Sequence, residues 1–154
     1  MTQYRAQQGV SGRHVTIHAT VDGVVHDLGM AKTFESSVEK SDTEVNTLRN
    51  NWTQHKGGVL SGSISMTLYF GCPLFHSMMQ EYATTGIDKY FLLTVSNNDP
   101  GSEQGAQVTY YQNCLLTSIQ PSKADVDSDM LEEDAEINFS GMEYGQKFAD
   151  NTLI

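Results

Sequence analysis

Basic residues are scarce in this chain of 154 residues. Its 9 lysines and arginines stand against 19 aspartates and glutamates, which gives a formal net charge of −10. A protein that grips nucleic acid needs a dense cluster of cations to neutralise phosphates, and the sequence contains no such cluster. The charge balance therefore predicts a surface that stays soluble and repels DNA.

Cysteines and long apolar runs are also rare. Two cysteines, Cys72 and Cys114, are too few for the disulfide framework of a small secreted domain, and we interpret both as reduced and packed. The N-terminus lacks the apolar run of a signal peptide, and no stretch reaches the length of a membrane span. We expect a protein without a membrane partner that is made and assembled in a cytoplasm.

The motifs of common enzymes are missing as well. The sequence has no nucleophile elbow, no H-E-x-x-H, no P-loop and no dinucleotide-binding glycine motif. Cys72 and His76 stand four residues apart on one predicted helix, which is a poor geometry for a Cys–His couple. We therefore expect neither an enzyme nor a cofactor.

Two groups of possible metal ligands have simpler interpretations. His14, His18 and His26 are compatible with a zinc site, but alternation on a surface strand also produces this pattern. Asp125, Asp127 and Asp129 are spaced as in a calcium loop, yet the sixth position carries Met130 where glycine is required. Polar surface histidines and a solvated acidic loop are the favoured interpretations, and no metal is expected.

The main secondary-structure signal in the chain is the alternation of apolar and polar residues. It predicts strands over residues 13–19, 24–28, 32–46, 61–70, 90–96, 107–120 and 131–139, the first two joined by a tight turn at Asp22-Gly23. Pro73 opens one helix over residues 73–85, which Gly86 ends. In the last predicted strand Leu131, Ala135, Ile137 and Phe139 are expected to face inward. The fold prediction is mainly β, with two packed antiparallel sheets (a β-sandwich or partial barrel) and one flanking α-helix.

The predicted organisation is a single domain with short extensions. Residues 1–12 are expected to form a flexible N-terminal arm, residues 13–140 the β-sandwich domain, and residues 141–154 a C-terminal tail. Residues 47–58 show no period and are expected to form a long loop, which in a compact domain is usually functional.

Two of the predicted strands have a wholly polar face. Thr33, Glu35, Ser37 and Glu39 alternate along one of them, and Ser63, Ser65, Thr67 and Tyr69 along the other. Such faces lie against bulk solvent in many antiparallel sheets. They are equally compatible with the wall of a water-filled channel, and the pattern alone leaves both options open.

The order of short motifs along the chain resembles a known family. The motifs are K-T-F-E-x-x-V-E-K at 32–40, E-V-N at 44–46, H-K-G-G at 55–58, G-S-I-S-M-T-L-Y at 62–69, M-x-x-Y-x-x-x-G at 79–86, D-K-Y-F at 88–91, N-D-P at 98–100 and L-E-E-D at 131–134. Together they are similar to the tail tube protein of contractile-tailed phages, defective prophages and phage-tail-like particles. The resemblance covers about residues 32–150.

This resemblance implies a structural subunit of a virion. Six subunits would close a ring around a lumen, and the rings would stack into a tube that conducts DNA during ejection without binding it specifically. The implied partners are further copies of the chain and the tail sheath, tape-measure and baseplate proteins. Assembly would take place in the cytoplasm of the bacterial host.

Two sets of residues receive roles under this hypothesis. The residues expected to face the lumen are Glu35, Ser37, Glu39, Ser63, Ser65 and Thr67. The residues expected at contacts between subunits or rings are Arg49, Trp52, His55, Lys56, Asp125, Asp127 and Asp129.

Two other classes of protein compete with this interpretation. A soluble β-sandwich module that binds a carbohydrate or a protein would display several aromatic side chains on a flat face, for which Tyr69, Tyr110 and Tyr111 are candidates. A hydrolase with unusual catalytic residues is disfavoured by the missing motifs.

Overall fold

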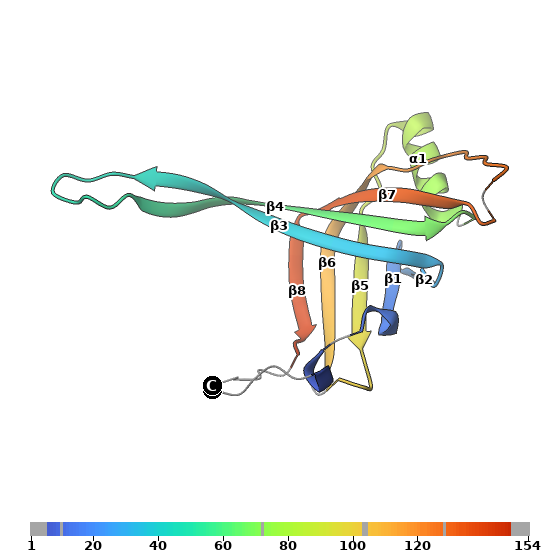
Figure 1. Cartoon of the computed structure of the whole chain (residues 1–154). Helices are drawn as coiled ribbons and strands as arrows, with labels where there is room; N and C mark the ends of the chain where they lie inside the picture. The colour runs from blue at the N-terminus through green and yellow to red at the C-terminus, as the bar shows by residue number, and fades with distance from the viewer. Residues whose placement is uncertain (1–5, 10, 72, 103–104, 128, 149–154) are drawn as a thin grey trace.

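The strands predicted by alternation form one antiparallel system in the computed structural model, which describes residues 6–9, 11–71, 73–102, 105–127 and 129–148. Figure 1 shows the chain with its elements labelled. The elements are η1 (Ala6–Gln8), η2 (Gly12–His14), β1 (Val15–Val21), β2 (Val24–Asp27), β3 (Ala31–Val45), β4 (Gln54–Tyr69), α1 (Pro73–Thr85), β5 (Phe91–Asn98), β6 (Ala106–Ser118), β7 (Glu132–Phe139) and β8 (Gly141–Gln146). The mainly β class and the single helix are therefore confirmed.

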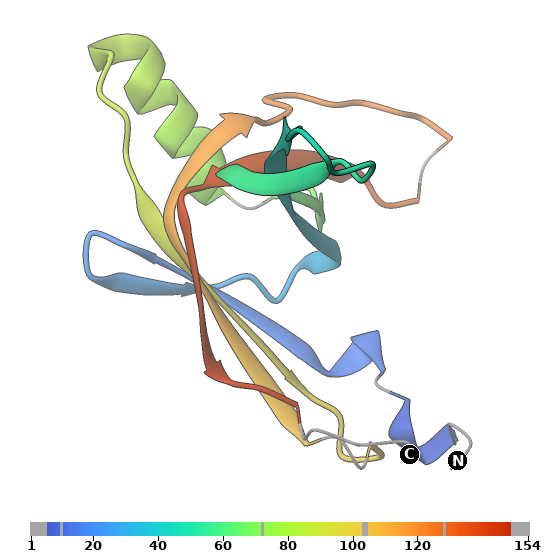
Figure 2. The ribbon, with the colours of Figure 1, turned by 90° about the vertical axis from the view of Figure 1, so that its left-hand side faces the viewer.

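The strands are hydrogen-bonded in the order β2-β1-β5-β6-β7-β4-β3, with β8 also paired to β6. The group β2, β1, β5 and β8 runs across the group β7, β4 and β3, and β6 belongs to both (Figure 1). The predicted pair of separate sheets is thus only partly correct, because one continuous eight-stranded sheet folds over on itself. Figure 2 shows the fold from the side, with the hairpin of β3 and β4 toward the viewer.

Strand β6 turns the corner between the two groups. Its first part pairs with β5 and β8, and Leu115, Leu116 and Ser118 pair with β7. The register with β5 shifts between Phe91 and Leu93, and Asn113 has a φ of 51°. A bulge of this kind bends a strand, which allows β6 to pass from one group to the other.

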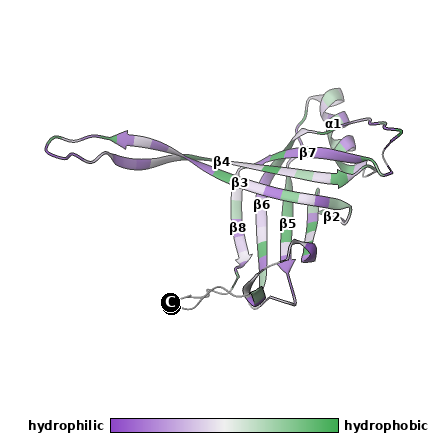
Figure 3. Ribbon diagram, in the orientation of Figure 1, coloured by the Kyte–Doolittle hydropathy of each residue, from purple (hydrophilic) through white to green (hydrophobic). Residues whose placement is uncertain are grey.

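The core lies where the two groups cross. Figure 3 shows strands of this region alternating between hydrophobic and hydrophilic colours. The buried apolar residues are Ile17, Ala19, Val21, Leu28, Ile64, Met66, Leu68, Phe75, Met78, Phe91, Leu93, Tyr111, Cys114, Ala135, Ile137 and Phe139. Burial raises the pKa of the Cys114 thiol to about 12, as expected for a packed cysteine. Cys72 lies outside the described residues.

The predicted turn and helix are confirmed. Asp22 and Gly23 have φ angles of 51° and 79°, as a type I′ hairpin turn requires. The helix α1 spans the predicted residues, and Gly86 ends it with a φ of 72°. Among the described residues no helix has the length and apolar character to cross a membrane.

The predicted loop over residues 47–58 is wrong at its C-terminal side. Strand β4 begins at Gln54, and His55 and Lys56 pair with Glu44 and Thr43 of β3. Both faces of this part of the hairpin are exposed, so the residues carry no alternation to detect. A Cβ atom at Gly57 would lie 3.2 Å from the Lys40 side chain, which shows that this side chain lies over the glycine.

The predicted extensions at both ends also need correction. Gly141–Gln146 is not a tail but strand β8, paired with β6, and its exposed residues again give no alternation. Part of the predicted N-terminal arm lies outside the described residues. The rest contains η1 and is fixed at its end, because the Ser11 N–H donates to Asp99 Oδ2 at 2.8 Å. This bond and one from the Gly101 N–H lower the pKa of Asp99.

One buried carboxylate escaped the sequence analysis. Glu133 lies on the inward face of β7 and is fully buried, and its Oε2 is 2.7 Å from Nε2 of His76 on α1. The His76 ring also contacts Phe70, with the ring centroids 5.6 Å apart. The signal was present, because Glu133 has the same parity as Ala135 and Ile137. This pair ties the helix to the sheet.

Candidate assembly surfaces

One face of β3, β4 and β7 is polar across all three strands. The strand registers place its residues in rows, which are Thr33–Thr67–Asp134, Glu35–Ser65–Glu136 and Ser37–Ser63–Asn138. Two hydrogen bonds cross this polar face, from Ser37 Oγ to Ser63 Oγ (3.1 Å) and from the Thr67 hydroxyl to Asp134 Oδ1 (2.9 Å). The rows contain carboxylates and hydroxyls but neither lysine nor arginine.

The structure brings together the residues that the sequence assigned to a lumen. Glu35, Ser37, Ser63, Ser65 and Thr67 all lie in these rows. Glu39 follows one row further, opposite Ser61. Asp134, Glu136 and Asn138 continue the same face; the sequence shows their alternation but not the register that places them beside β4. A sheet face of carboxylates and hydroxyls is suited to contact with water.

Two strand edges of this region have no strand beside them in the part of the chain that the structure describes. Strand β3 pairs with β4 on one side and presents its other edge along all 15 residues. Residues 115–118 of β6 pair with β7 on one side, and β5 begins too late to cover the other. The open edge of β3 is long enough to pair with a strand of another chain.

The hairpin of β3 and β4 extends far beyond the body (Figure 1). We call residues 38–61 the hairpin arm and residues 46–53, between the two strands, its tip. The arm exposes many apolar side chains, which are Val38, Val45, Leu48, Trp52, Val59 and Leu60. Leu48 is 96% and Trp52 83% exposed, so neither contributes to the core of its own chain.

The residues predicted at subunit contacts fall at two distant places. Arg49 and Trp52 lie in the tip, and His55 and Lys56 follow on β4. His55 Nδ1 is 2.8 Å from Asp42 Oδ2 on the same arm, so an acidic partner is already present within the chain. Reaching Asp125, Asp127 and Asp129 requires a different molecule, because their loop lies at the opposite end of the chain (Figure 1).

The acidic loop, residues 121–130, is exposed at each of these aspartates. Asp125 Oδ1 accepts a hydrogen bond from the Asp127 N–H at 3.0 Å, which forms a local turn.

Among the described residues no group of three or more side chains is placed to bind a metal ion. His14 and His18 each lie near an aspartate, at 3.9 Å from Asp99 and 4.0 Å from Asp27.

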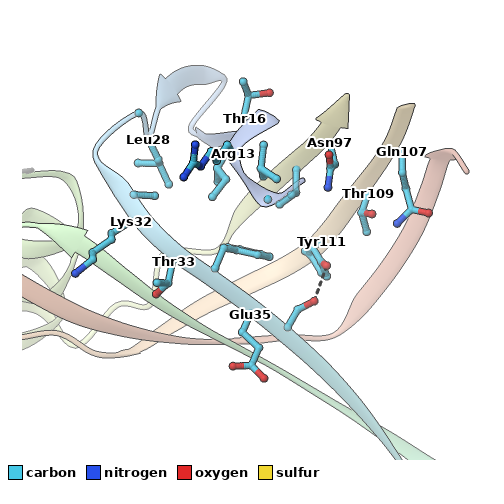
Figure 4. Close-up of a pocket in the computed structure, with 18 of the residues that line it drawn as sticks. Arg13, Thr16, Leu28, Lys32, Thr33, Glu35, Asn97, Gln107, Thr109 and Tyr111 are labelled. Carbon is cyan, nitrogen blue, oxygen red and sulfur yellow. Dashed lines mark hydrogen bonds between the residues drawn. The ribbon is translucent and has the colours of Figure 1, made fainter. Parts of the chain in front are cut away.

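A groove of about 830 Å³ opens between the start of β3 and the strands β1, β5 and β6 (Figure 4). Apolar side chains line one part of it, which are Val15, Ile17, Leu28, Ala31, Phe34 and Val95. Asn97, Gln107 and Thr109 supply polar groups, and Tyr111 donates or accepts a 2.7 Å hydrogen bond with Ser36. Tyr111 is buried, so the three tyrosines considered for a flat carbohydrate-binding face do not share an exposed surface.

Comparisons with known proteins agree with this geometry. The profile of a family described as phage tail tube protein matches residues 2–145. The phage-like element PBSX protein XkdM of Bacillus subtilis (strain 168) is 30% identical over 146 residues, which cover 95% of this chain and 97% of that protein.

Solved structures with low sequence identity share the fold. One is a chain of the sheath-tube complex of the PVC extracellular contractile injection system, with a TM-score of 0.69, 11% identity and coverage of 92% of this chain and 94% of that one. Another comes from the tail of an empty gene transfer agent particle, refined helically with C6 symmetry, with a TM-score of 0.63, 15% identity and coverage of 90% and 100%.

Proposed function

The chain belongs to the phage tail tube protein family, and on this basis we propose that six copies close into a ring and that stacked rings conduct DNA during ejection. Family membership makes the chain a structural component of a phage-type tail, not an enzyme. The observation that carries the finer proposal is the pair of open edges on β3 and β6. Purification followed by electron microscopy tests it: tubes are expected, and a stable monomer at every concentration contradicts it.

Ring closure follows from the positions of the two open edges. In our proposal the free edge of β3 in one copy lies beside residues 115–118 of β6 in the next copy. Because these are different surfaces, the contact is head-to-tail, and such a contact either closes into a ring or propagates. Closure covers the 15-residue edge of β3, which would otherwise be free to aggregate. The C6 symmetry of the similar gene transfer agent tail supports the number six.

The polar face is proposed to form the wall of the lumen. Glu35, Ser37, Glu39, Ser63, Ser65 and Thr67 would then face the channel, together with Asp134, Glu136 and Asn138. DNA is held at protein surfaces mainly by cations that neutralise its phosphates. A wall of carboxylates and hydroxyls offers none, so DNA slides past without specific binding. Screening over about 8 Å at physiological salt leaves the repulsion effective at close range.

Exchanging Glu35 and Glu39 for lysine should slow or block DNA ejection while leaving the tube intact. The substitutions place cations where phosphates pass, and both side chains are exposed, so folding is unaffected. Ejection kinetics and infectivity measure the effect. A matched variant, Asp22→Lys with Glu143→Lys, makes the same change in net charge at exposed positions away from the polar face and from residues 115–118 of β6. Normal infectivity of the Glu35→Lys/Glu39→Lys variant contradicts the assignment.

Stacking of rings is proposed to use the hairpin arm. Arg49, Trp52, His55 and Lys56 of one ring would meet the acidic loop of another, at Asp125, Asp127 and Asp129. The two surfaces lie at opposite ends of the chain (Figure 1), as a contact that repeats along a tube requires. Opposite charges at such a contact favour the correct partner and speed association.

The double variant Arg49→Glu/Lys56→Glu should fail to polymerise. Each substitution turns an attraction to the acidic loop into a repulsion between like charges. Sedimentation and negative-stain microscopy report polymerisation. The charge-preserving exchange Arg49→Lys/Lys56→Arg is the control and should assemble, and adding Asp125→Lys and Asp127→Lys to the reversed variant should restore tubes in part. Normal tubes from the reversed variant would refute the contact.

The remaining partners follow from the same proposal. The tube would lie inside a sheath, with tape-measure and baseplate proteins in the same tail. The similar PVC chain comes from a sheath-tube complex, which supports a sheath partner. Assembly would take place in the cytoplasm of the host bacterium.

A further inference from the structure

The free edge of β6 borders a small groove, which we call the α1–β6 groove. Leu116 and Thr117 of β6 line it together with Met79 and Tyr82 of α1, and Figure 2 shows α1 beside the end of β6. Its volume is about 280 Å³. Sites that bury drug-sized ligands are generally larger, so this groove is suited to a single side chain. It lies at the edge where our proposal adds a strand from the neighbouring copy.

Symmetry determines the direction and the face of that incoming strand. Strands β6, β7, β4 and β3 are paired antiparallel in this order, so β3 runs opposite to β6. Rotation about a tube axis preserves direction, so β3 of one copy lies antiparallel to β6 of the next. The polar face continues across this junction, and the other side chains of β3 therefore turn toward α1. Leu116 has the same parity, since it pairs with the buried Ile137.

One apolar side chain of β3 with this parity is available for a neighbour. Between the two register shifts of β3, the residues that turn toward α1 are Phe34, Ser36, Val38 and Lys40. Phe34 packs against the core of its own chain, and the Ser36 hydroxyl is 2.7 Å from that of Tyr111. Val38 is 43% exposed and lies beyond this core. It is therefore the residue that fits an apolar groove on a second copy.

Charge complementarity supports a second copy as the occupant. Two charged residues line the groove, and one of them, Lys89, is 2.9 Å from Asp22 and 3.1 Å from Glu81. The other, Asp88, is exposed and takes part in no ion pair among the described residues. The same holds for Lys40, which follows Val38 on the same face of β3. A free cation on the strand thus matches a free carboxylate at the groove.

We propose that Val38 of one copy packs into the α1–β6 groove of the next copy in the ring, and that Lys40 pairs with Asp88 there. The inference rests on the proposed tube, in which it specifies the contact between neighbours within one ring. Strand addition of this kind combines main-chain hydrogen bonds along an edge with pockets for alternate side chains. The groove also determines the register, because a shift of two residues would place Ser36 or Lys40 among its apolar side chains.

Reversing charges tests the ion pair. Lys40→Asp and Asp88→Lys should each raise the critical concentration for assembly by about threefold to tenfold, and the combination should restore it. Both side chains are exposed, so the thermal unfolding of the subunit should not change. Lys40→Asp with Glu143→Lys is the control, because it has the same net charge as the combined variant and should stay impaired. Equal recovery with Glu143→Lys, or unaffected single variants, overturns the pairing.

Shortening Val38 tests the apolar part of the contact. Val38→Ala removes two buried carbon atoms from the proposed interface and should raise the critical concentration by about tenfold. Val25→Ala is the control, since Val25 is also an exposed strand residue but lies on β2, outside the groove. It should assemble like the unmodified chain. Equal critical concentrations for the two variants contradict packing of Val38.

Disulfide trapping separates this contact from the proposed tube. A chain with Val38→Cys and Met79→Cys, oxidised after assembly, should give a ladder of covalent oligomers that ends at the six copies of the proposed ring. Val38→Cys with Ser77→Cys, an exposed position on α1 outside the groove, should give no ladder. Tubes without the first ladder, or a ladder that continues beyond six, overturn the contact and leave the tube standing. If the unmodified chain forms no tubes at any concentration, both proposals fail.

Discussion

Replacing residues 41–59 by an Asn-Gly turn should yield a folded subunit that forms no tubes. Lys40 and Leu60 are paired neighbours, so a two-residue hairpin turn can join the strands there. None of the buried core residues lies in the deleted segment. The deletion removes the tip with its exposed apolar groups, together with Arg49 and Lys56, which in our account hold rings together.

Thermal unfolding and electron microscopy together measure this result. The unfolding midpoint should stay near that of the intact subunit, because exposed segments contribute little to stability. Tubes should be absent at concentrations where the intact chain assembles. Tubes of normal length from the deletion variant, or a midpoint that falls as for a core substitution, contradict the role of the arm.

Exchanging His76 for alanine should destabilise the subunit by about 3–5 kcal/mol, since it leaves the buried Glu133 carboxylate without its partner. For a chain of this length such a loss lowers the unfolding midpoint by roughly 6–20 °C. Glu133 is fully buried and its Oε1 already lacks a partner among the described residues, so no compensating contact is at hand. Calorimetry at neutral pH measures the shift.

The Lys32–Glu132 ion pair, which has the same separation, is the control. Lys32 Nζ lies 2.7 Å from Glu132 Oε1, on the residue next to Glu133, but both side chains are substantially exposed. Lys32→Ala should therefore leave the midpoint close to that of the intact chain, because exposed pairs contribute little. Adding Glu133→Leu to His76→Ala should recover part of the loss by removing the buried charge. Equal effects of His76→Ala and Lys32→Ala would show that burial does not decide the outcome.

The alternation of apolar and polar residues predicts those strands and helices that have one buried face and one exposed face. Ile64, Met66 and Leu68 alternate with polar residues because β4 is buried on one side, and α1 shows its apolar stripe for the same reason. The Asp22-Gly23 turn follows from the backbone angles that type I′ turns demand. At these positions local chemistry and tertiary packing agree.

Two kinds of structure are not predicted by this alternation. Some strands are exposed on both faces, and some contacts join residues that are far apart in the sequence. The far half of the arm and β8 are exposed on both sides, so their strands carry no period. Parity marks Glu133 as inward-facing, but its pairing with His76 was not predicted because the two residues are 57 positions apart in the chain. The crossing of the two strand groups depends on a bulge near Asn113, which no local motif announces.

The candidate surfaces also differ in how far the sequence predicts them. Parity along β3 and β4 places Glu35, Ser37, Ser63, Ser65 and Thr67 on one side of each strand, and the observed register then aligns them into rows. The groove combines residues from β1, β3, β5 and β6, which only the folded chain brings together. The sequence therefore predicted the polar face but not the groove.

A helical reconstruction of the assembled protein by cryo-electron microscopy tests the central claim most directly. The account predicts sixfold rings in which the free edge of β3 lies beside residues 115–118 of β6 in the adjacent copy, with Glu35 and Ser65 facing the channel. A tube whose polar face points outward, or whose β3 edge meets no strand of a neighbour, would contradict it.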